Sequence, residues 1–547
     1  MARIIQICKL ALVATFWAST PVAAKHAEDT KEADLFWKAQ RAELTGQSDS
    51  ALKSYNRLLG KLPESGVAVD RLFDVAIVQG DLPSTLKAAR AQQLANSGDA
   101  ALPLIFFVDA WKRGDYDEAA KATEWLKERS IFGFLAPVLE AWIDVARGKQ
   151  GAISNAALRE SGLLQYYSFD QLIFLDLATG NIENAQRRLS SFPGFADDYA
   201  RHMAMTAAEH LGRNGEAEYA NSLLQHLGSE PAIFATKPKI FPSDQALAGL
   251  FSRLSEQLDE QGIADQSLYF ARLSHWIAPS SVYGRMTLAK RLAASGSEAR
   301  ATTLLDGIAP TRPQWSWALG DKARVLIADG KSSEALSLVK NARLGRPDAQ
   351  DLVLLEAQQL EANKQFGAAS ALYEKLVAAA DASGAKNGRR VTFRLLLAQS
   401  FQVQGKRQDA NVALEEALVL NSENPQILNM LGYSLLEQRE NVKRGFELVS
   451  KAHRLSPQSP AITDSLGWAH YLNGEFAAAV PLLEQAVQGA INDVTINEHL
   501  GDAYWQAGRG VDARYAWRSA LLQAEGETAK RIAAKADIGW TEATAAP

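Results

Sequence analysis

Histidine and lysine side chains are the first candidates for chemistry in this chain of 547 residues. None of the eight histidines has the HExxH spacing that places two imidazoles on one helix face for zinc. His470 falls at a core-facing helix position, which favours a neutral, hydrogen-bonded imidazole. Gly330-Lys331-Ser332 lacks the earlier glycine of a phosphate loop, because Val325 stands there. The sequence therefore indicates no metal, nucleotide or nucleophile site, and we expect no cofactor.

Composition and charge limit the remaining classes of function. The chain is 47% hydrophobic and 22% charged, a balance that is typical of a globular protein able to bury a core. The 58 Lys and Arg residues are outnumbered by 63 Asp and Glu residues, which gives a formal charge of −5. Because no global basic field exists, we do not expect binding to nucleic acid.

The N-terminus has the features of an export signal. Basic residues flank an apolar stretch at 10–18, and small residues fit a cut after Ala24. This stretch is shorter than the roughly 20 residues needed to span a bilayer, so we expect no stable membrane insertion. The only cysteine, Cys8, lies ahead of the apolar stretch, where it cannot be the acylated residue of a lipoprotein signal. We therefore expect a periplasmic mature protein without disulfides.

Glycines that end helical stretches recur along the chain with a nearly constant period. The glycines at this spacing are Gly46, Gly80, Gly114 and Gly148, then Gly262, Gly296 and Gly330, then Gly474 and Gly508. Gly180 and Gly212 follow Gly148 at slightly shorter spacings. Gly405 lies two periods after Gly330, with a small excess, and two periods before Gly474. Each of these double periods has its middle glycine replaced, near Lys364 and near Arg439.

Between these glycines, apolar residues recur at i, i+3, i+4 and i+7, which indicates amphipathic helices. A helix-turn-helix unit with a period of about 34 residues resembles the tetratricopeptide repeat, or TPR. Gly432, Gly467 and Gly501 stand where two antiparallel helices of such a unit approach closely. The sequence thus predicts an all-α fold, a right-handed TPR superhelical solenoid of about fourteen helix pairs.

Prolines and changes in repeat quality divide the chain. Pro231, Pro238 and Pro242 cannot continue a helix, and a polar helix at 527–537 suits the role of covering the last repeat. The predicted segments are a cleaved signal peptide at 1–24, weaker TPR-like helical repeats at 25–230, a proline-containing connector at 231–243, a cleaner TPR array at 244–523, and a capping helix with a frayed tail at 524–547.

The last repeats resemble a more specific group of proteins. The matching stretches are Leu431-Gly432-Tyr433-Ser434, Asp464-Ser465-Leu466-Gly467-Trp468 and His499-Leu500-Gly501-Asp502-Ala503-Tyr504-Trp505. They resemble the C-terminal region of exported TPR proteins of Gram-negative bacteria, which implies protein interaction and not catalysis. One branch of that group is a lipoprotein adaptor that activates a carboxyl-terminal processing protease. This chain differs from the branch because it lacks the lipobox cysteine.

The repeat register selects candidate partner-binding residues. With Gly432, Gly467 and Gly501 at the eighth position, the inner surface includes Asn429, Tyr433, Asp464, Trp468, Tyr471, Glu498, Asp502 and Trp505. Such aromatic and acidic side chains can hold an extended peptide through apolar contacts and hydrogen bonds. Alternatively, the aromatic rings pack sideways against the adjacent repeat, and the carboxylates are merely solvated.

A possible catalytic motif comes from a second resemblance. Glu160-Ser161-Gly162-Leu163-Leu164-Gln165 is similar to two elements of lytic transglycosylases, the glutamate-serine step and the glycine-leucine-methionine-glutamine segment. In those enzymes the elements are separate, whereas here they are fused, with no catalytic domain around them. This arrangement favours a helix end followed by a loop, and we expect no enzyme.

Three hypotheses of function remain in order of preference. The first is an exported scaffold that binds protein or peptide partners in the cell envelope; in the finer form that the family resemblance implies, it is an adaptor for an envelope protease. The second is a fixed structural component of an envelope or polysaccharide-export assembly. The third is an enzyme that cleaves cell-wall glycan. Pull-down at low and high salt separates the first two, and incubation with peptidoglycan tests the third.

The signal features predict that the mature protein begins at Lys25 and is found in the periplasm. N-terminal sequencing of protein recovered from the cell envelope checks both parts of the prediction. An intact Met1, or recovery only in membranes after salt and carbonate washing, would contradict it.

Overall fold

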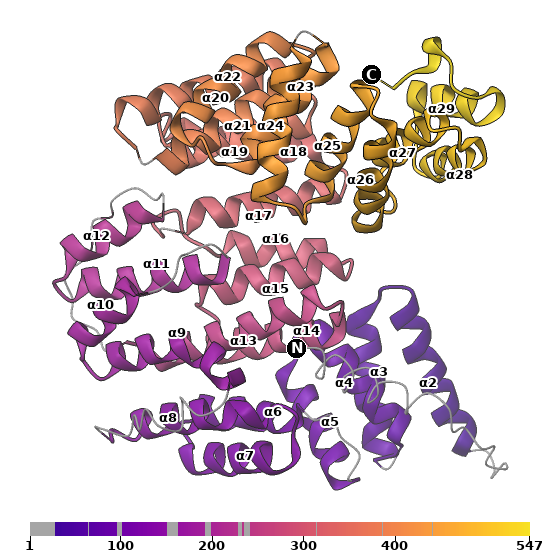
Figure 1. Cartoon of the computed structure of the whole chain (residues 1–547). Helices are drawn as coiled ribbons and strands as arrows, with labels where there is room; N and C mark the ends of the chain where they lie inside the picture. The colour runs from indigo at the N-terminus through magenta and orange to yellow at the C-terminus, as the bar shows by residue number, and fades with distance from the viewer. Residues whose placement is uncertain are drawn as a thin grey trace. The chain divides into compact units, whose positions relative to one another are not determined.

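A computed structural model describes residues 28–546 except 64, 96–100, 150–161, 192–197, 228–231, 233, 235–240, 313, 386 and 440. Every regular element in this part of the chain is helical, and most consecutive helices pack against each other as antiparallel neighbours (Figure 1). The described helices form two compact units that divide at Val325 and Leu326, inside α17 (Trp315–Ala328). The all-α solenoid fold is therefore confirmed.

The helices of the first unit are mostly two to four turns long. They are α2 (Glu28–Leu44), α3 (Ser48–Lys61), α4 (Gly66–Gln79), α5 (Leu82–Leu94), α6 (Leu102–Lys112), α7 (Tyr116–Arg129), the 3₁₀ turn η1 (Gly133–Leu135), α8 (Ala136–Ala146), α9 (Gly162–Ala178), α10 (Ile182–Ser190), α11 (Asp198–Arg213), α12 (Ala217–His226), α13 (Ser243–Glu260), α14 (Ala264–Ile277), α15 (Val282–Ala294) and α16 (Glu298–Asp306).

The helices of the second unit are more regular in length. They are α18 (Ser332–Leu344), α19 (Gln350–Ala362), α20 (Phe366–Ala382), α21 (Asn387–Val403), α22 (Arg407–Leu420), α23 (Pro425–Gln438), α24 (Val442–Leu455), α25 (Pro460–Leu472), α26 (Phe476–Gly489), α27 (Val494–Gln506), α28 (Gly510–Leu521), α29 (Gly526–Ile538) and the 3₁₀ turn η2 (Glu542–Thr544). The small excess in the repeat spacing near 381–390 lengthens α20 and α21.

The turns within the helix pairs need a residue in the left-handed region, which glycine adopts at least cost. The glycines of the repeat period have φ near +75°, as at Gly474 and Gly508. Lys364 (φ 59°) and Arg439 (φ 53°) adopt the same conformation where the period lacks glycine. One predicted turn residue is wrong, because Gly212 lies inside α11 and Gly215 (φ 100°) makes the turn.

Close helix approach explains the glycines inside the first helices of the pairs. A Cβ atom on Gly467 would lie 2.7 Å from Leu483 Cγ, and one on Gly432 would lie 2.8 Å from Val449. At Gly501 the indole of Trp517 occupies the space of a side chain. These glycines therefore set the spacing of α25 to α26, α23 to α24 and α27 to α28.

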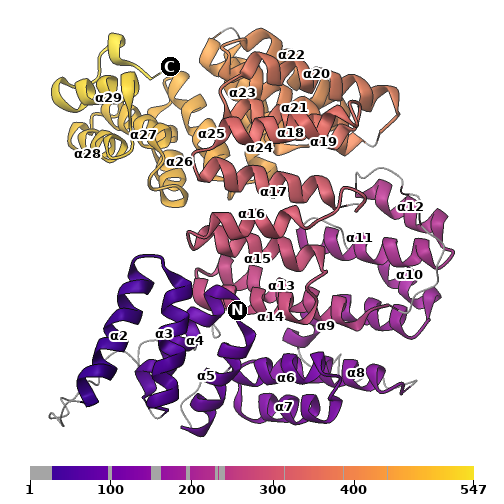
Figure 2. The same cartoon turned by 180° about the vertical axis from the view of Figure 1, so that it is seen from behind.

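The first unit is more than a linear stack, because α14 also packs against α4 and α6, which lie far earlier in the chain (Figure 2). The buried Arg272 side chain donates from Nε to the Ile77 carbonyl at the end of α4, at 2.7 Å. Tyr269 donates to the Ala101 carbonyl at 2.7 Å. The helix dipole favours the Arg272 cation at the C-terminus of α4. The contacts of Arg272 and Tyr269 join the first helices to α14.

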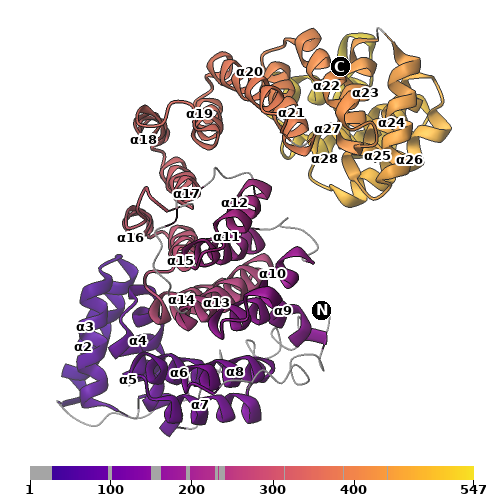
Figure 3. The same cartoon turned by 90° about the vertical axis from the view of Figure 1, so that its left-hand side faces the viewer.

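Helices on both sides of the predicted connector belong to this first unit. In Figure 3, α13 lies beside α9, and Gln171 on α9 donates to the Ala246 carbonyl at 3.3 Å. Most residues of the connector at 231–243 lie outside the described part of the chain. The compact units divide at Val325 and Leu326, well beyond the predicted boundary between 25–230 and 244–523, because α13 and α14 complete the packing of earlier helices.

The C-terminal segment also differs from the prediction. The capping helix is present as α29, but the tail after it folds back and is not frayed, because the amide of Ala546 donates to Asp502 Oδ2 at 3.3 Å. Ala546 is buried in the same apolar cluster as Trp468 and Tyr471. The final described residues are thus part of the packed structure.

Stability in the second unit should be local, since its helix pairs contact mainly their neighbours. Gly467→Leu should force α25 from α26 at a cost of about 1 to 3 kcal/mol and raise hydrogen exchange in those helices more than in α19 and α20. Gly388→Leu is the matched control, because no atom lies within 4 Å of a Cβ there. An equal loss of protection throughout the unit would contradict the prediction.

Candidate functional site

Most of the predicted partner-binding residues lie close together on α25 and α27, but they are buried among the chain's own side chains. Asp464, Glu498 and Asp502 are buried, as are Trp468 and Tyr471. Asn429, Tyr433 and Trp505 are half-buried. Sideways packing of the aromatic rings is therefore present, whereas the carboxylates are paired and not merely solvated.

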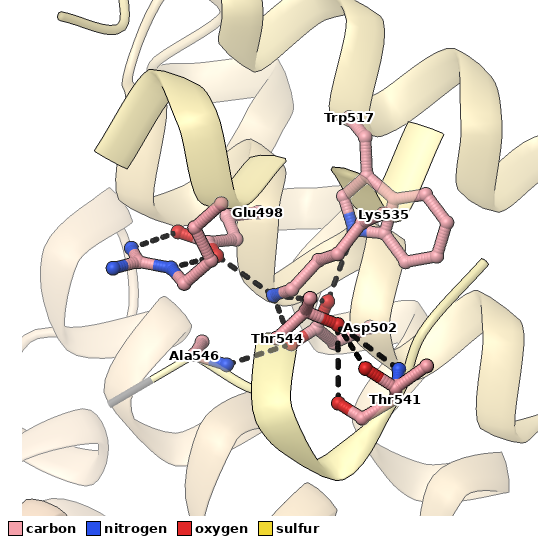
Figure 4. A network of polar contacts seen from close by, with 8 residues as sticks. Glu498, Asp502, Trp517, Lys535, Thr541, Thr544 and Ala546 are labelled. Carbon is pink, nitrogen blue, oxygen red and sulfur yellow. Dashed lines mark hydrogen bonds and ion pairs between the residues drawn. The ribbon is translucent and has the colours of Figure 1, made fainter. Parts of the chain in front are cut away.

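A buried ion cluster joins α27 to α29 (Figure 4). Lys535 has no exposed surface, and its ammonium group donates to Glu498 Oε1 at 2.7 Å and to both oxygens of Asp502 at 2.8 and 2.7 Å. Arg531 binds the two oxygens of Glu498 at 2.9 and 2.8 Å. Trp517 donates from Nε1 to Asp502 at 3.0 Å. Each carboxylate therefore has several partners, as a buried charge requires.

The two carboxylates of this cluster respond differently to their surroundings. Burial by itself would raise the pKa of Glu498, but the hydrogen bond from Arg531 and the charge of Lys535 outweigh it and hold this pKa below its usual range. Burial dominates at Asp502 and raises its pKa, although the Lys535 charge opposes the change. The cluster thus lowers the pKa of Glu498 and raises that of Asp502.

Aromatic stacking forms the second part of the site. The Trp468 ring stacks on Tyr471 at 4.5 Å and on His499 at 4.0 Å between centroids. The Nδ1 atom of His499 lies 3.0 Å from Asp464 Oδ1, and both groups are buried. Burial by itself would lower the pKa of His499, but the nearby carboxylate of Asp464 outweighs it and raises this pKa.

The remaining predicted residues lie at the edges of this arrangement. Trp505 packs beside Trp517, with the Arg514 guanidinium 5.2 Å from its ring centroid. Burial raises the pKa of Tyr433, with Glu437 adding to the effect. Asn429 Oδ1 is buried and has no hydrogen-bond partner among the described residues.

The final residues cover the aromatic and acidic side chains. Gly539 ends α29 with φ 93°, and the space that a Cβ would need there is filled by the Trp505 ring. The chain then turns through η2, where Thr541 and Thr544 hydrogen-bond each other, and reaches Asp502 at Ala546 (Figure 4). The segment 539–546, which we name the C-terminal tail, thus lies on the predicted partner-binding residues.

Sequence reasoning missed Lys535 and Ala546 as members of the site. Lys535 lies one repeat period after Gly501, where the earlier repeats have a small residue. A lysine at that position of a capping helix, about one period beyond Glu498 and Asp502, could have indicated an ion pair with these two carboxylates. The path of the tail had no comparable signal, because residues 539–546 do not continue the repeat pattern from which a register can be read.

The other candidate residues that the structure describes make local contacts. Gly330 makes a turn between α17 and α18, and Lys331 pairs with Asp329 at 2.6 Å. His470 is partly exposed and contacts Glu475 at 2.5 Å. Glu160 lies outside the described residues. Among the residues that are described, no group of His, Cys, Asp or Glu could hold a metal ion, and no helix is both long and apolar enough to cross a membrane.

The family profile described as the tetratricopeptide repeat matches residues 395–460 and 465–529, which include α22 to α24, most of α25, and α26 to α28. These segments are tetratricopeptide repeats. A TPR repeat-containing protein of Pseudomonas aeruginosa is 33% identical over 182 residues, which cover 32% of this chain and 29% of the relative. The chain therefore spans less than a third of the length of the curated relative that it matches.

The solved structures that match this chain share little sequence with it. The APC/C hetero-tetramer of Cut9 and Hcn1 gives a TM-score of 0.37 at 16% identity, with 92% of this chain and 96% of that chain covered. Yeast Tom70 gives 0.36 at 13% identity, with 94% and 96% covered. MamA gives 0.27 at 18% identity, with 35% and 96% covered.

The ion cluster makes a prediction about stability. Lys535→Met should leave two buried carboxylates without their shared cation and destabilise the last TPR pair by about 3 to 5 kcal/mol. Native-state hydrogen exchange of α27 and α28 measures this loss, and adding Asp502→Asn should restore part of it. Lys530→Met is the control, because Lys530 pairs with Glu527 on the exposed surface. Equal effects of the two lysine substitutions would contradict the account.

The His499 environment makes a prediction about pH. A raised folded-state pKa means that the protonated imidazole stabilises the fold below the unfolded pKa of about 6.5, and that this stabilisation is lost as pH rises through the folded pKa. Hydrogen-exchange protection of α25 and α27, corrected for intrinsic exchange, should therefore fall as the pH rises above about 6.5. His499→Gln should remove this dependence, and His470→Gln should retain it.

Proposed function

We propose that this protein is an exported TPR scaffold that binds an extended segment of a protein partner along its last repeats. TPR arrays serve in general as surfaces for protein interaction and not as catalysts. The predicted export signal and the resemblance to exported TPR proteins favour the cell envelope as its location.

The observation that carries the proposal is that the predicted binding residues already hold polypeptide. Asp502 accepts a hydrogen bond from a backbone amide of the tail, and Trp468 shares an apolar cluster with the small side chain of Ala546. Extended peptides offer these same groups, a row of amides and alternating side chains. The chemistry of the site therefore suits a peptide.

A finer form of the proposal makes the scaffold an adaptor for an envelope protease. It rests on the family resemblance of the last repeats alone. A scaffold of this type would act by positioning a client, with no catalytic group of its own. Co-purification with a protease, and faster cleavage of a client in its presence, would support this form.

The proposal predicts where a partner crosslinks. A photo-reactive phenylalanine derivative at Tyr433, beside the site, should crosslink a partner in the intact envelope. The same residue at Tyr515, which is exposed on α28, is the matched control and should give several-fold less product. Mass spectrometry identifies the crosslinked protein. Equal yields from both positions would place recognition elsewhere on the array.

A further inference from the structure

The C-terminal tail is held much less firmly than the helix before it. Lys535 and Arg531 fix α29 through buried or half-buried ion pairs. After Gly539, the described contacts of the tail to the rest of the chain are the Ala546 amide bond to Asp502 and the apolar packing of Trp540 and Ala546. Residues 541–543 are exposed. The tail can therefore leave while α29 remains in place, because no ion pair has to break.

The tail gives no hydrogen bond to a buried indole of the cluster that it joins. Trp468 is 1% exposed, yet its Nε1 has no hydrogen-bond partner among the described residues. On α23, in the preceding repeat, Asn429 Oδ1 is also without a partner. An unmade hydrogen bond of a buried group costs free energy that a suitable ligand can recover. An extended partner backbone has both a carbonyl and an amide to offer, so it can satisfy groups that the tail does not.

We infer that the C-terminal tail is a built-in competitor, which occupies the peptide site in cis until an extended segment of a partner with small side chains takes its place. This inference rests on the proposed function and names the occupant and the partner chemistry of the same site. Ala546 places a small side chain in the apolar cluster of Trp468 and Tyr471, so the site should select Ala, Ser or Gly at that point of the partner. Asp502 selects a backbone amide there and disfavours an acidic residue.

Tethering explains why such a tail competes well. A short linker gives the tail an effective concentration on the order of millimolar, so a partner at micromolar concentration must bind the site much more tightly than the tail does. Only a segment with additional contacts along the inner face reaches this affinity. The competitor therefore raises selectivity by excluding weak peptides.

Two substitutions open the site without changing any residue beneath the tail. Gly539→Val places a side chain where the Trp505 ring lies and strains a backbone at φ 93°. Ala546→Asp puts a charge next to Asp502 in an apolar cluster. Gly508→Val is the matched control, because it strains a similar backbone, at φ 78°, with no atom within 4 Å of the Cβ.

The probe is a fluorescent peptide with the sequence of residues 539–546 and an amidated C-terminus. By fluorescence anisotropy, both opened variants should bind it at least about tenfold more tightly than the wild type, since the tethered competitor is gone. The Gly508→Val control should bind like the wild type. A peptide with aspartate in place of the alanine corresponding to Ala546 should not bind any variant.

Hydrogen exchange of the purified proteins provides the second measurement. The amides of the tail should be protected in the wild type and should exchange at least about tenfold faster in the opened variants, while α29 remains protected. A tail that is unprotected in the wild type would overturn the inference. So would opened variants with an exposed tail that bind the probe no better than the wild type.

Failure of the inference can be told apart from failure of the proposed function. Partner crosslinking at Tyr433 that is equal in the wild type and in Gly539→Val would overturn the built-in competitor and leave the scaffold function standing. Tight binding of the probe by the opened variants, without any crosslinked partner in the envelope, would support the competitor and remove the support for the partner. A several-fold rise in crosslinking in Gly539→Val would support both.

Discussion

A pair of antiparallel helices buries its apolar stripe only when another pair stacks against it, and this constraint governs both units. Each pair depends on its neighbours, so every end of the array needs a cover. In the first unit α14 supplies contacts to α4 and α6, with Arg272 at the end of α4. In the second unit α29 and the C-terminal tail cover the last pair. The first unit thus gains contacts between distant helices, whereas the second gains a cover over its last pair.

The cover of the last pair has a consequence for function, because it uses the inner-face residues. Glu498 and Asp502 hold the capping helix through Lys535, so neither carboxylate can be given up to a partner without a loss of stability. The aromatic residues Trp468 and Tyr471, by contrast, take no part in the ion pairs that hold α29. Recognition of a partner is therefore expected to depend on apolar contacts and backbone hydrogen bonds more than on the charge of these acids.

The regular part of this architecture could be predicted because its causes are local. A constant repeat period and the need for a left-handed residue in each turn located the turns, including those at Lys364 and Arg439. Gly467 and Gly501 were predictable because only a small residue lets two helices approach. The return of α14 to α4 was not predictable, since Arg272 and Ile77 lie far apart in the sequence and no repeat register relates them. The contact of Ala546 with Asp502 was not predictable either, because no repeat register relates these two residues.

The repeat register predicted which residues lie together in the site, but it did not predict the partners that their side chains bind. Register places Asp464, Glu498 and Asp502 on the same inner face, yet His499 binds the first and Lys535 the other two. The difference arises from side chains outside the predicted positions, of which Lys535 lies in the cap and not in a binding repeat. At the end of an array, covering the last repeat and offering a binding surface require the same residues. A weakly held tail can cover the last repeat and still be replaced by a partner. The same residues can then serve as a binding surface.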